Sequence, residues 1–191
     1  MPGQTKSTVD ILLAESFKEL VYKRPIEKIT IKEITDKAGV IRPTFYNHFQ
    51  DKYELLEWII RTELIDPMRP LIQNGLSDQA LLFVFTGVQN DKEFYVRARR
   101  LEGQNSFESI VTKCIQDTLL DAFGMSEFDD KMVKSLTPEL ISMYYAKAMC
   151  FLVLSWIDSG MKTTPQEMAD IYKYLVNHSV EEALEDKGEK V

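Results

Sequence analysis

The stretch TIKEITDKAGVIRPTFYNHFQDK, residues Thr30 to Lys52, decides the fold of this chain. Thr30 and Glu33 have the spacing of a capping box, which predicts that a helix begins here. Gly39 is expected to end that helix, because glycine readily adopts the positive φ that many helix C-termini need. Arg42-Pro43-Thr44 predicts a second helix start, since proline costs little in a first turn. The stretch therefore predicts two short helices joined by a tight turn.

Two short helices around a glycine turn form the layout of a helix-turn-helix, whose second helix enters the DNA major groove. Phe45 and Phe49 lie four residues apart and define the buried face of that second helix. The polar and basic side chains between and before them must then face outward. We expect the motif to cover about residues 30–49 and to bind DNA.

The rest of the chain has the apolar spacing of helices rather than the alternation of strands. Asp51 is expected to cap a helix that Pro67 and Pro70 break. The other expected helices cover residues 8–23, 78–88, 91–102, 105–123, 138–160 and a last one capped by Thr164 and Glu167. We predict an all-α protein, with an N-terminal three-helix helix-turn-helix domain over residues 1–66 and a C-terminal helical bundle over residues 67–191 for effector binding and dimerisation.

The net charge of −7 is unevenly distributed. Residues 1–52 hold 9 Lys/Arg and 7 Asp/Glu, giving +2, and residues 53–191 hold 14 and 23, giving −9. A mildly basic head on an acidic body fits a protein in which only the head meets phosphate.

The chain shows no sign of secretion or of a membrane anchor. Its N-terminus, MPGQTKSTVD, lacks the apolar core of a signal peptide. The longest apolar stretch, Ala148 to Ile157, is shorter than the roughly 20 residues that a membrane span needs. We expect a cytoplasmic protein in which Cys114 and Cys150 are buried, reduced thiols, with a disulfide or a redox role as the alternative.

The segment from Pro138 to Ser159 is apolar around most of the predicted helix. A helix that is apolar on all sides must be covered on all sides. It is either the central helix of a single-chain bundle or part of a homodimer interface. We expect the second, through the last two helices, because one chain of this size covers only one face.

The N-terminal stretch resembles the TetR family of bacterial transcriptional regulators. The resemblance covers about the first 60 residues and rests on Thr30–Ile34, Ala38-Gly39-Val40, Thr44–Phe49, Asp51-Lys52 and Leu55-Leu56. It implies a dimer that binds a palindromic DNA operator and a small-molecule effector, here of unknown identity. The ending Trp156, Gly160-Met161 and Thr164–Glu167 is similar to a DhaS-like subgroup, which contains a dihydroxyacetone-responsive activator.

The candidate DNA-binding residues are Thr30, Lys32, Arg42, Pro43, Thr44, Tyr46, Asn47, His48 and Lys52. Arginine can bind guanine with two hydrogen bonds, and a threonine methyl can touch a thymine methyl. Asn47 either contacts an adenine or positions the backbone, and we expect a neutral His48 to hydrogen-bond a phosphate. Thr30 and Lys52 each allow two interpretations, a structural cap or ion-pair partner and a phosphate contact.

For the effector pocket the sequence offers only side chains that combine apolar surface with a polar group, and plain core packing is the alternative for each. They are Tyr95, Arg99, Tyr144, Tyr145, Met149 and Trp156. Nothing in the spacing of the Ser, His, Cys, Asp or Glu residues suggests catalysis, a metal site or a cofactor. We expect a repressor that an effector releases from its operator, with a DhaS-like coactivator that acts through protein contacts as the alternative and an enzyme as a remote third.

Overall fold

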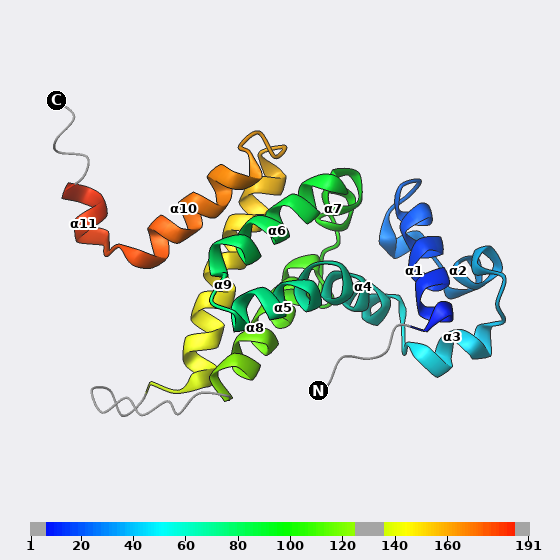
Figure 1. Ribbon diagram of the computed structural model, residues 1–191. Coiled ribbons are helices and arrows are strands. Elements are labelled where there is room, and N and C mark those ends of the chain that lie inside the picture. The colour runs from blue at the N-terminus through cyan, green and yellow to red at the C-terminus, as the bar shows by residue number, and fades with distance from the viewer. Residues whose placement is uncertain (1–6, 125–135, 186–191) are drawn as a thin grey trace.

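The computed structural model describes residues 7–124 and 136–185, and every regular element within those ranges is a helix (Figure 1). The prediction of an all-α protein is therefore confirmed. In chain order the elements are α1 (Thr8–Val21), η1 (Ile26–Lys28), α2 (Ile31–Ala38), α3 (Arg42–His48), α4 (Lys52–Ile60), η2 (Arg61–Ile65), α5 (Asp66–Gln73), α6 (Ser77–Asn90), α7 (Lys92–Ala98), α8 (Phe107–Gly124), α9 (Pro138–Asp158), α10 (Pro165–Asn177) and α11 (Val180–Glu185).

Helices α1, α2 and α3 form a compact head at one end of the molecule, and α4 leads from it into the body (Figure 1). The predicted helix boundaries are confirmed here. Thr30 and Glu33 complete the capping box of α2, Gly39 follows it with a φ of +69°, and Asp51 caps α4. The head buries Phe17, Ile34, Phe45 and Leu56 among its helices. These buried side chains fix α3 on the surface of the head.

The prediction that Pro67 and Pro70 break the fourth helix is wrong. The chain continues from α4 through the π-helical turn η2 into α5, which contains both prolines. In η2 the hydrogen bonds span five residues, as in the bond from the Asp66 N–H to the Arg61 carbonyl. The wide turn is followed by Pro67 in the first turn of α5, where a missing N–H is tolerated. The proposed boundary after residue 66 thus lies within a continuous helical run.

The body packs α8 along α9 and places α6 between α5 and α10 (Figure 1). Helix α6 approaches η2 closely at Gly87, where a Cβ atom would lie 2.5 Å from the Leu64 Cδ2. Cys114 on α8 and Cys150 on α9 are free, buried thiols. Burial raises the pKa of Cys114 to about 12, so this thiol has little reactivity at neutral pH.

Helix α9 covers most of the predicted helix over residues 138–160 and extends well beyond the apolar stretch Ala148–Ile157. By length and composition it could cross a membrane: its most apolar 18-residue window has a mean hydropathy of 1.6, and 39% of that window is buried inside the molecule. One face, which includes Ala146, Cys150 and Val153, packs into the body. Leu140, Met143, Tyr144 and Phe151 lie exposed on the remaining surface.

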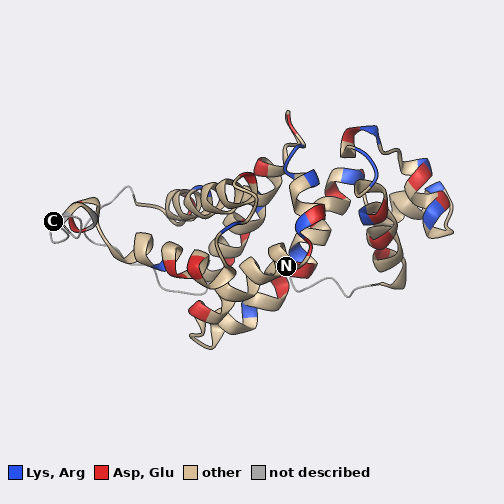
Figure 2. Ribbon diagram, turned by 90° about the horizontal axis from the view of Figure 1, so that it is seen from above, with Lys and Arg blue, Asp and Glu red and all other residues tan. Residues whose placement is uncertain are grey.

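The head and the body are tied together by ion pairs around α1. The Lys18 ammonium lies 2.8 Å from Glu63 of η2 and 2.6 Å from Asp91, and the Tyr22 hydroxyl donates to Asp91 at 2.7 Å. Burial disfavours the charged form of Lys18, but its bonds with Asp91 and Glu63 outweigh this and raise its pKa. Elsewhere on the head, cations and carboxylates are interleaved along the helices (Figure 2).

Candidate nucleic-acid interface

Helix α3 is held against the head by its aromatic residues. Phe45 is fully buried and Phe49 is nearly so, and their rings lie 5.8 Å apart. Tyr46 packs edge-on against Phe45, yet 52% of its surface stays exposed. The buried pair turns the remaining faces of α3 toward solvent, as the phenylalanine spacing predicted.

The exposed surface of α3 carries most of the candidate DNA-binding residues together. Arg42, Pro43, Tyr46 and Asn47 are exposed, and Thr44 is half-buried. Arg42 has no ion-pair partner within residues 7–124 and 136–185, and it lies close enough to Lys32 for the two positive charges to repel. The guanidinium therefore remains available for a ligand of opposite charge.

Thr30 and Lys32 lie at the start of α2 and are both engaged within the protein. The Thr30 hydroxyl accepts from the Glu33 N–H and donates to the Glu33 carboxylate at 2.7 Å. The Thr30 hydroxyl and backbone, together with Arg24, lower the pKa of Glu33 to about 2. Lys32 pairs with Asp36 at 2.7 Å on the exposed surface. An exposed ion pair contributes little free energy, so Lys32 can leave Asp36 to bind another anion. Thr30 thus has the structural role of a cap. This role is compatible with an additional contact between Thr30 and a phosphate.

Lys52 uses its ammonium group inside the protein. Its Nζ donates to the carbonyl oxygens of Ile26, Glu27 and Ile29 at 2.8, 2.9 and 2.8 Å. A lysine has three donor hydrogens, so all are occupied. Burial lowers the pKa of Lys52. Of its two expected roles, this geometry favours the structural one, in which Lys52 fixes the turn η1 beside α2.

His48 has a partner that the sequence did not reveal. Its Nδ1 lies 2.7 Å from Oδ1 of Asp10, a residue on α1 that is 38 positions away in the chain. Asp10 is buried and belongs to the capping box of α1 with Ser7. The S-x-x-D spacing signals the cap, but no local pattern predicts a contact between α1 and α3.

Ile41 is a second residue that the sequence analysis did not single out. It precedes α3 directly and is 69% exposed, although isoleucine is usually buried. An exposed apolar side chain beside Arg42 suits contact with a thymine methyl group. Its signal in the sequence was an apolar residue just outside the predicted helix.

The six candidate effector residues differ in burial and in their partners. Tyr95 and Trp156 are buried, and the Trp156 Nε1 donates to the Thr163 carbonyl at 2.8 Å. Arg99 pairs with Asp158 at 3.0 Å, whereas Tyr144 is 69% exposed on α9. Tyr145 and Met149 are half-buried on α9.

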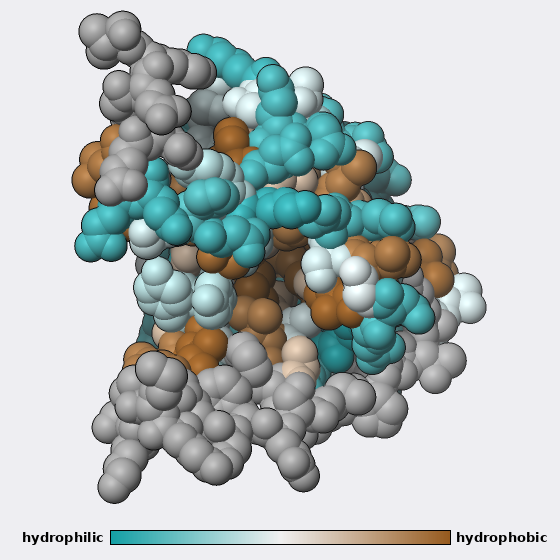
Figure 3. All heavy atoms as spheres, turned by 60° about the vertical axis from the view of Figure 1, so that its left-hand side comes forward, coloured by the Kyte–Doolittle hydropathy of each residue, from teal (hydrophilic) through white to brown (hydrophobic). Residues whose placement is uncertain are grey.

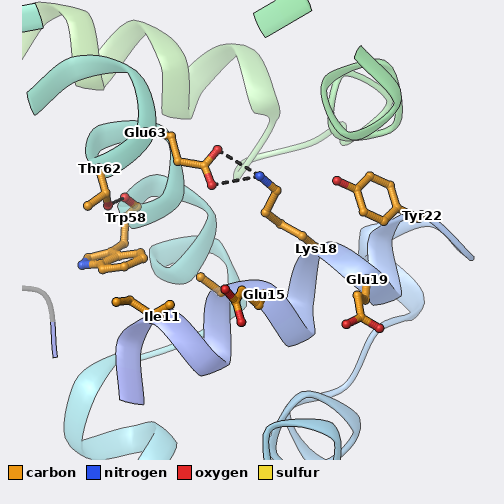
Figure 4. Close-up of a pocket in the computed structure, with 9 residues that line it drawn as sticks. Ile11, Glu15, Lys18, Glu19, Tyr22, Trp58, Thr62 and Glu63 are labelled. Carbon is orange, nitrogen blue, oxygen red and sulfur yellow. Dashed lines mark hydrogen bonds and ion pairs between the residues drawn. The ribbon is translucent and has the colours of Figure 1, made fainter. Parts of the chain in front are cut away.

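A groove with a volume of about 520 Å³ lies between α1 of the head and the α4–η2 run (Figure 4). Ile11 and Trp58 lie at one end, while the Lys18–Glu63 ion pair lies farther along it. None of the six candidate effector residues lines this groove. A second hollow, on α7, is lined by Lys92, Glu93, Val96, Arg97 and Arg100.

The face formed by the C-terminal helices carries a hollow with apolar side chains in it (Figure 3). Exposed apolar residues continue from α9 onto α10 and α11. On these last two helices they are Ile171, Leu175, Val176, Val180 and Leu184. Each of the three helices at the end of the described chain therefore carries exposed apolar side chains.

Comparison with known proteins identifies the two parts of this architecture. A family model described as "Bacterial regulatory proteins, tetR family" matches residues 17–59, and one described as "Transcriptional regulator C-terminal region" matches residues 77–178. The second covers more than half of the chain. The chain belongs to the TetR family. It is therefore a DNA-binding transcriptional regulator rather than an enzyme.

One TetR-family relative is the HTH-type dhaKLM operon transcriptional activator DhaS of Lactococcus lactis. It is 25% identical over 169 residues, which cover 87% of this chain and 86% of that protein. A solved structure of the dihydroxyacetone kinase operon activator DhaS has a TM-score of 0.58 at 23% identity, covering 89% of this chain and 93% of that one. The resemblance to DhaS thus extends well beyond the head.

A second solved TetR-family structure is the repressor FadR of Thermus thermophilus in complex with lauroyl-CoA. Its TM-score is 0.55 at 17% identity, with 87% of this chain and 92% of that chain covered. At this identity the likeness shows a shared fold.

Proposed function

We propose that this protein binds a palindromic DNA operator as a homodimer through α3. The observation that carries the proposal is the surface of α3, where Arg42, Tyr46 and Asn47 are exposed around the buried Phe45. Arg42 in particular is free of any ion pair among the residues that the structure describes. Exposed groups of these types at the start of a short surface helix are suited to base and phosphate contacts.

The proposed dimer forms through α9 and α10. Their exposed apolar residues include Phe151, which is 68% exposed. In the proposed dimer the same residues of a second copy, related by a two-fold axis, bury this apolar surface. Two copies place two α3 helices on one duplex, which explains why a two-fold operator is needed. The modest charge of +2 on residues 1–52 supports the same proposal, because a single head has little electrostatic affinity for DNA.

The proposed effector is a small molecule that binds in the body of this cytoplasmic protein. Of the six candidate residues, Tyr95 has the strongest support. Its hydroxyl is buried and has no hydrogen-bond partner within the described ranges, although buried polar groups are normally paired. Burial raises the pKa of Tyr95 strongly, so the hydroxyl stays protonated and able to donate to a ligand.

Our first proposal for the direction of control is repression, relieved when the effector binds. The second is activation, including a coactivator that works through protein contacts, and it is favoured by the relative DhaS, which is named as an activator. A promoter–reporter fusion in cells with and without this gene separates the two. Higher expression without the gene supports repression, and lower expression supports activation.

Operator binding is tested by fluorescence anisotropy with the DNA upstream of the protein's own gene at low salt. Arg42→Ala should weaken binding by about 1–3 kcal/mol and relax the preference at one base position. Arg97→Ala is the matched control, because Arg97 lies on α7 and pairs with Glu93 at 2.9 Å. Equal affinities of the wild type and Arg42→Ala would refute base recognition by Arg42. No binding by a folded, dimeric wild type would overturn the proposed function.

A further inference from the structure

The imidazole of His48 is held from inside the head by a buried carboxylate. Asp10 is only 8% exposed, and its two oxygens have different partners. Oδ1 lies 2.7 Å from the His48 Nδ1, while Oδ2 accepts the Ser7 N–H at 3.0 Å. The Asp10 N–H in turn donates to the Ser7 hydroxyl at 3.1 Å, so the carboxylate is fixed at the start of α1.

These contacts decide which nitrogen of His48 carries hydrogen. A carboxylate offers only acceptor oxygens to its hydrogen-bond partners. Asp10 therefore accepts on both oxygens, and the His48 Nδ1 must donate. A neutral ring with hydrogen on Nδ1 has only a lone pair on Nε2. Such a ring cannot donate to a phosphate oxygen, which also offers only lone pairs.

Other charged groups on the elements around α3 are engaged elsewhere. On α2, Lys32 pairs with Asp36, Glu33 with Arg24 and Lys37 with Glu19. At the start of α4, Asp51 caps the helix, Lys52 donates to three carbonyl groups and Glu54 accepts the Gln50 N–H. Arg42 lies on α3 itself, two turns before His48. Asp10 is the charged group that contacts the imidazole directly.

We infer that His48 contacts a DNA phosphate only as a doubly protonated imidazolium, and that Asp10 is the positioning residue that imposes this requirement. The inference rests on the proposed binding of DNA through α3. It replaces the expected neutral His48 with a charged one, because Nδ1 is already committed to Asp10. Each head then takes up a proton when it binds the operator.

The consequence is an operator affinity that falls as the pH rises. By linkage, uptake of about one proton per head weakens binding by up to about tenfold per head for each pH unit. The affinity is to be measured from about pH 6 to 8.5. Ionic strength must be held constant, because phosphate contacts make binding depend on salt.

Asp10→Asn is the decisive variant. The asparagine oxygen can still accept the Ser7 N–H, while its NH₂ group donates to the His48 Nδ1. The neutral ring then carries its hydrogen on Nε2 and can donate to phosphate without a second proton. Asp10→Asn should therefore bind with little pH dependence and more tightly than the wild type at pH 8.5. Asp51→Asn is the matched control, since it removes the same charge from another helix cap and should keep the wild-type pH dependence.

Two measurements test the inference, both on the full chain. The first is operator affinity from pH 6 to 8.5 for the wild type and both variants. The second is the ¹⁵N NMR spectrum of His48 without DNA, which should show the Nδ1–H tautomer in the wild type and the Nε2–H tautomer in Asp10→Asn. A flat wild-type profile, equal pH dependence in wild type and Asp10→Asn, or an Nε2–H tautomer in the free wild type would each overturn it. Absence of operator binding at every pH would instead contradict the proposed function, and the tautomer measurement would still decide the role of Asp10.

Discussion

At the scale of single residues, polar side chains that bind backbone groups help to fix the helices of the head. Lys52 is the clearest case, because one ammonium group satisfies three carbonyl oxygens at the end of η1. Those carbonyls belong to Ile26, Glu27 and Ile29, which connect α1 to α2. Hydrogen bonds to a charged donor are stronger than neutral ones. Lys52 therefore fixes the position of α2, and through it the position of α3.

Lys52→Met should lower the free energy of unfolding by about 2 kcal/mol, because charged hydrogen bonds to partly buried carbonyl groups are lost. Urea unfolding followed by circular dichroism measures the change. Lys28→Met is the control, since Lys28 is exposed in the same turn and should change stability by less than about 0.5 kcal/mol. Equal stabilities of the two variants would show that the Lys52 bonds contribute nothing measurable.

At the scale of elements, the turn between α2 and α3 sets the angle at which α3 is presented. Gly39 adopts a φ of +69°, and a Cβ atom there would meet nothing within 4 Å. Any cost of a side chain at Gly39 is therefore conformational rather than steric. The turn is closed by the bond from the Val40 N–H to the Thr35 carbonyl at 3.0 Å.

Gly39→Ala should destabilise the protein by roughly 1 kcal/mol, because residues other than glycine disfavour positive φ. Gly39→Asn should cost less, since asparagine tolerates this conformation. Thermal or urea unfolding of the three proteins ranks them as glycine, then asparagine, then alanine. An alanine variant as stable as the wild type would mean that the turn relaxes to a negative φ.

At the scale of the whole molecule, helix α9 has one face in the core and another face exposed to solvent. Helix α9 packs Ala146, Cys150 and Val153 into its own body and leaves Tyr144 and Phe151 in solvent. Helices α10 and α11 also carry exposed apolar residues. A membrane would also cover such a surface, but the TetR family to which the chain belongs consists of transcriptional regulators, and we propose a second copy as the cover.

Phe151→Asp should convert the proposed dimer to a monomer, because a carboxylate would be buried without a partner in the interface. Sedimentation equilibrium measures the mass, and operator affinity should fall with it. Leu12→Asp is the control, since Leu12 is 41% exposed on α1 in the head and should leave the mass unchanged. A dimeric Phe151→Asp variant would place the interface elsewhere.

The limits of helices and the turn of the motif could be predicted because they depend on neighbours in the chain. A capping box joins residues three positions apart, and Gly39 ends α2 through its own φ, so Thr30, Glu33 and Gly39 were sufficient. The predicted helix break at Pro67 was wrong, because a π turn is selected by packing and not by a local sequence pattern. The outward face of α3 was likewise predicted from the spacing of Phe45 and Phe49, whereas the roles of its residues in DNA binding stay a prediction.

By itself, the sequence determined an all-helical chain with a helix-turn-helix head, the outward face of α3 and one long apolar helix near the end of the chain. Only the tertiary structure decided which distant groups meet. It brought Asp10 to His48 across 38 positions and Lys52 to the carbonyls of Ile26, Glu27 and Ile29. It also buried Tyr95 and left Tyr144 exposed. The physical reason is that caps and periodicity act within a few residues, whereas such contacts follow from how whole helices pack.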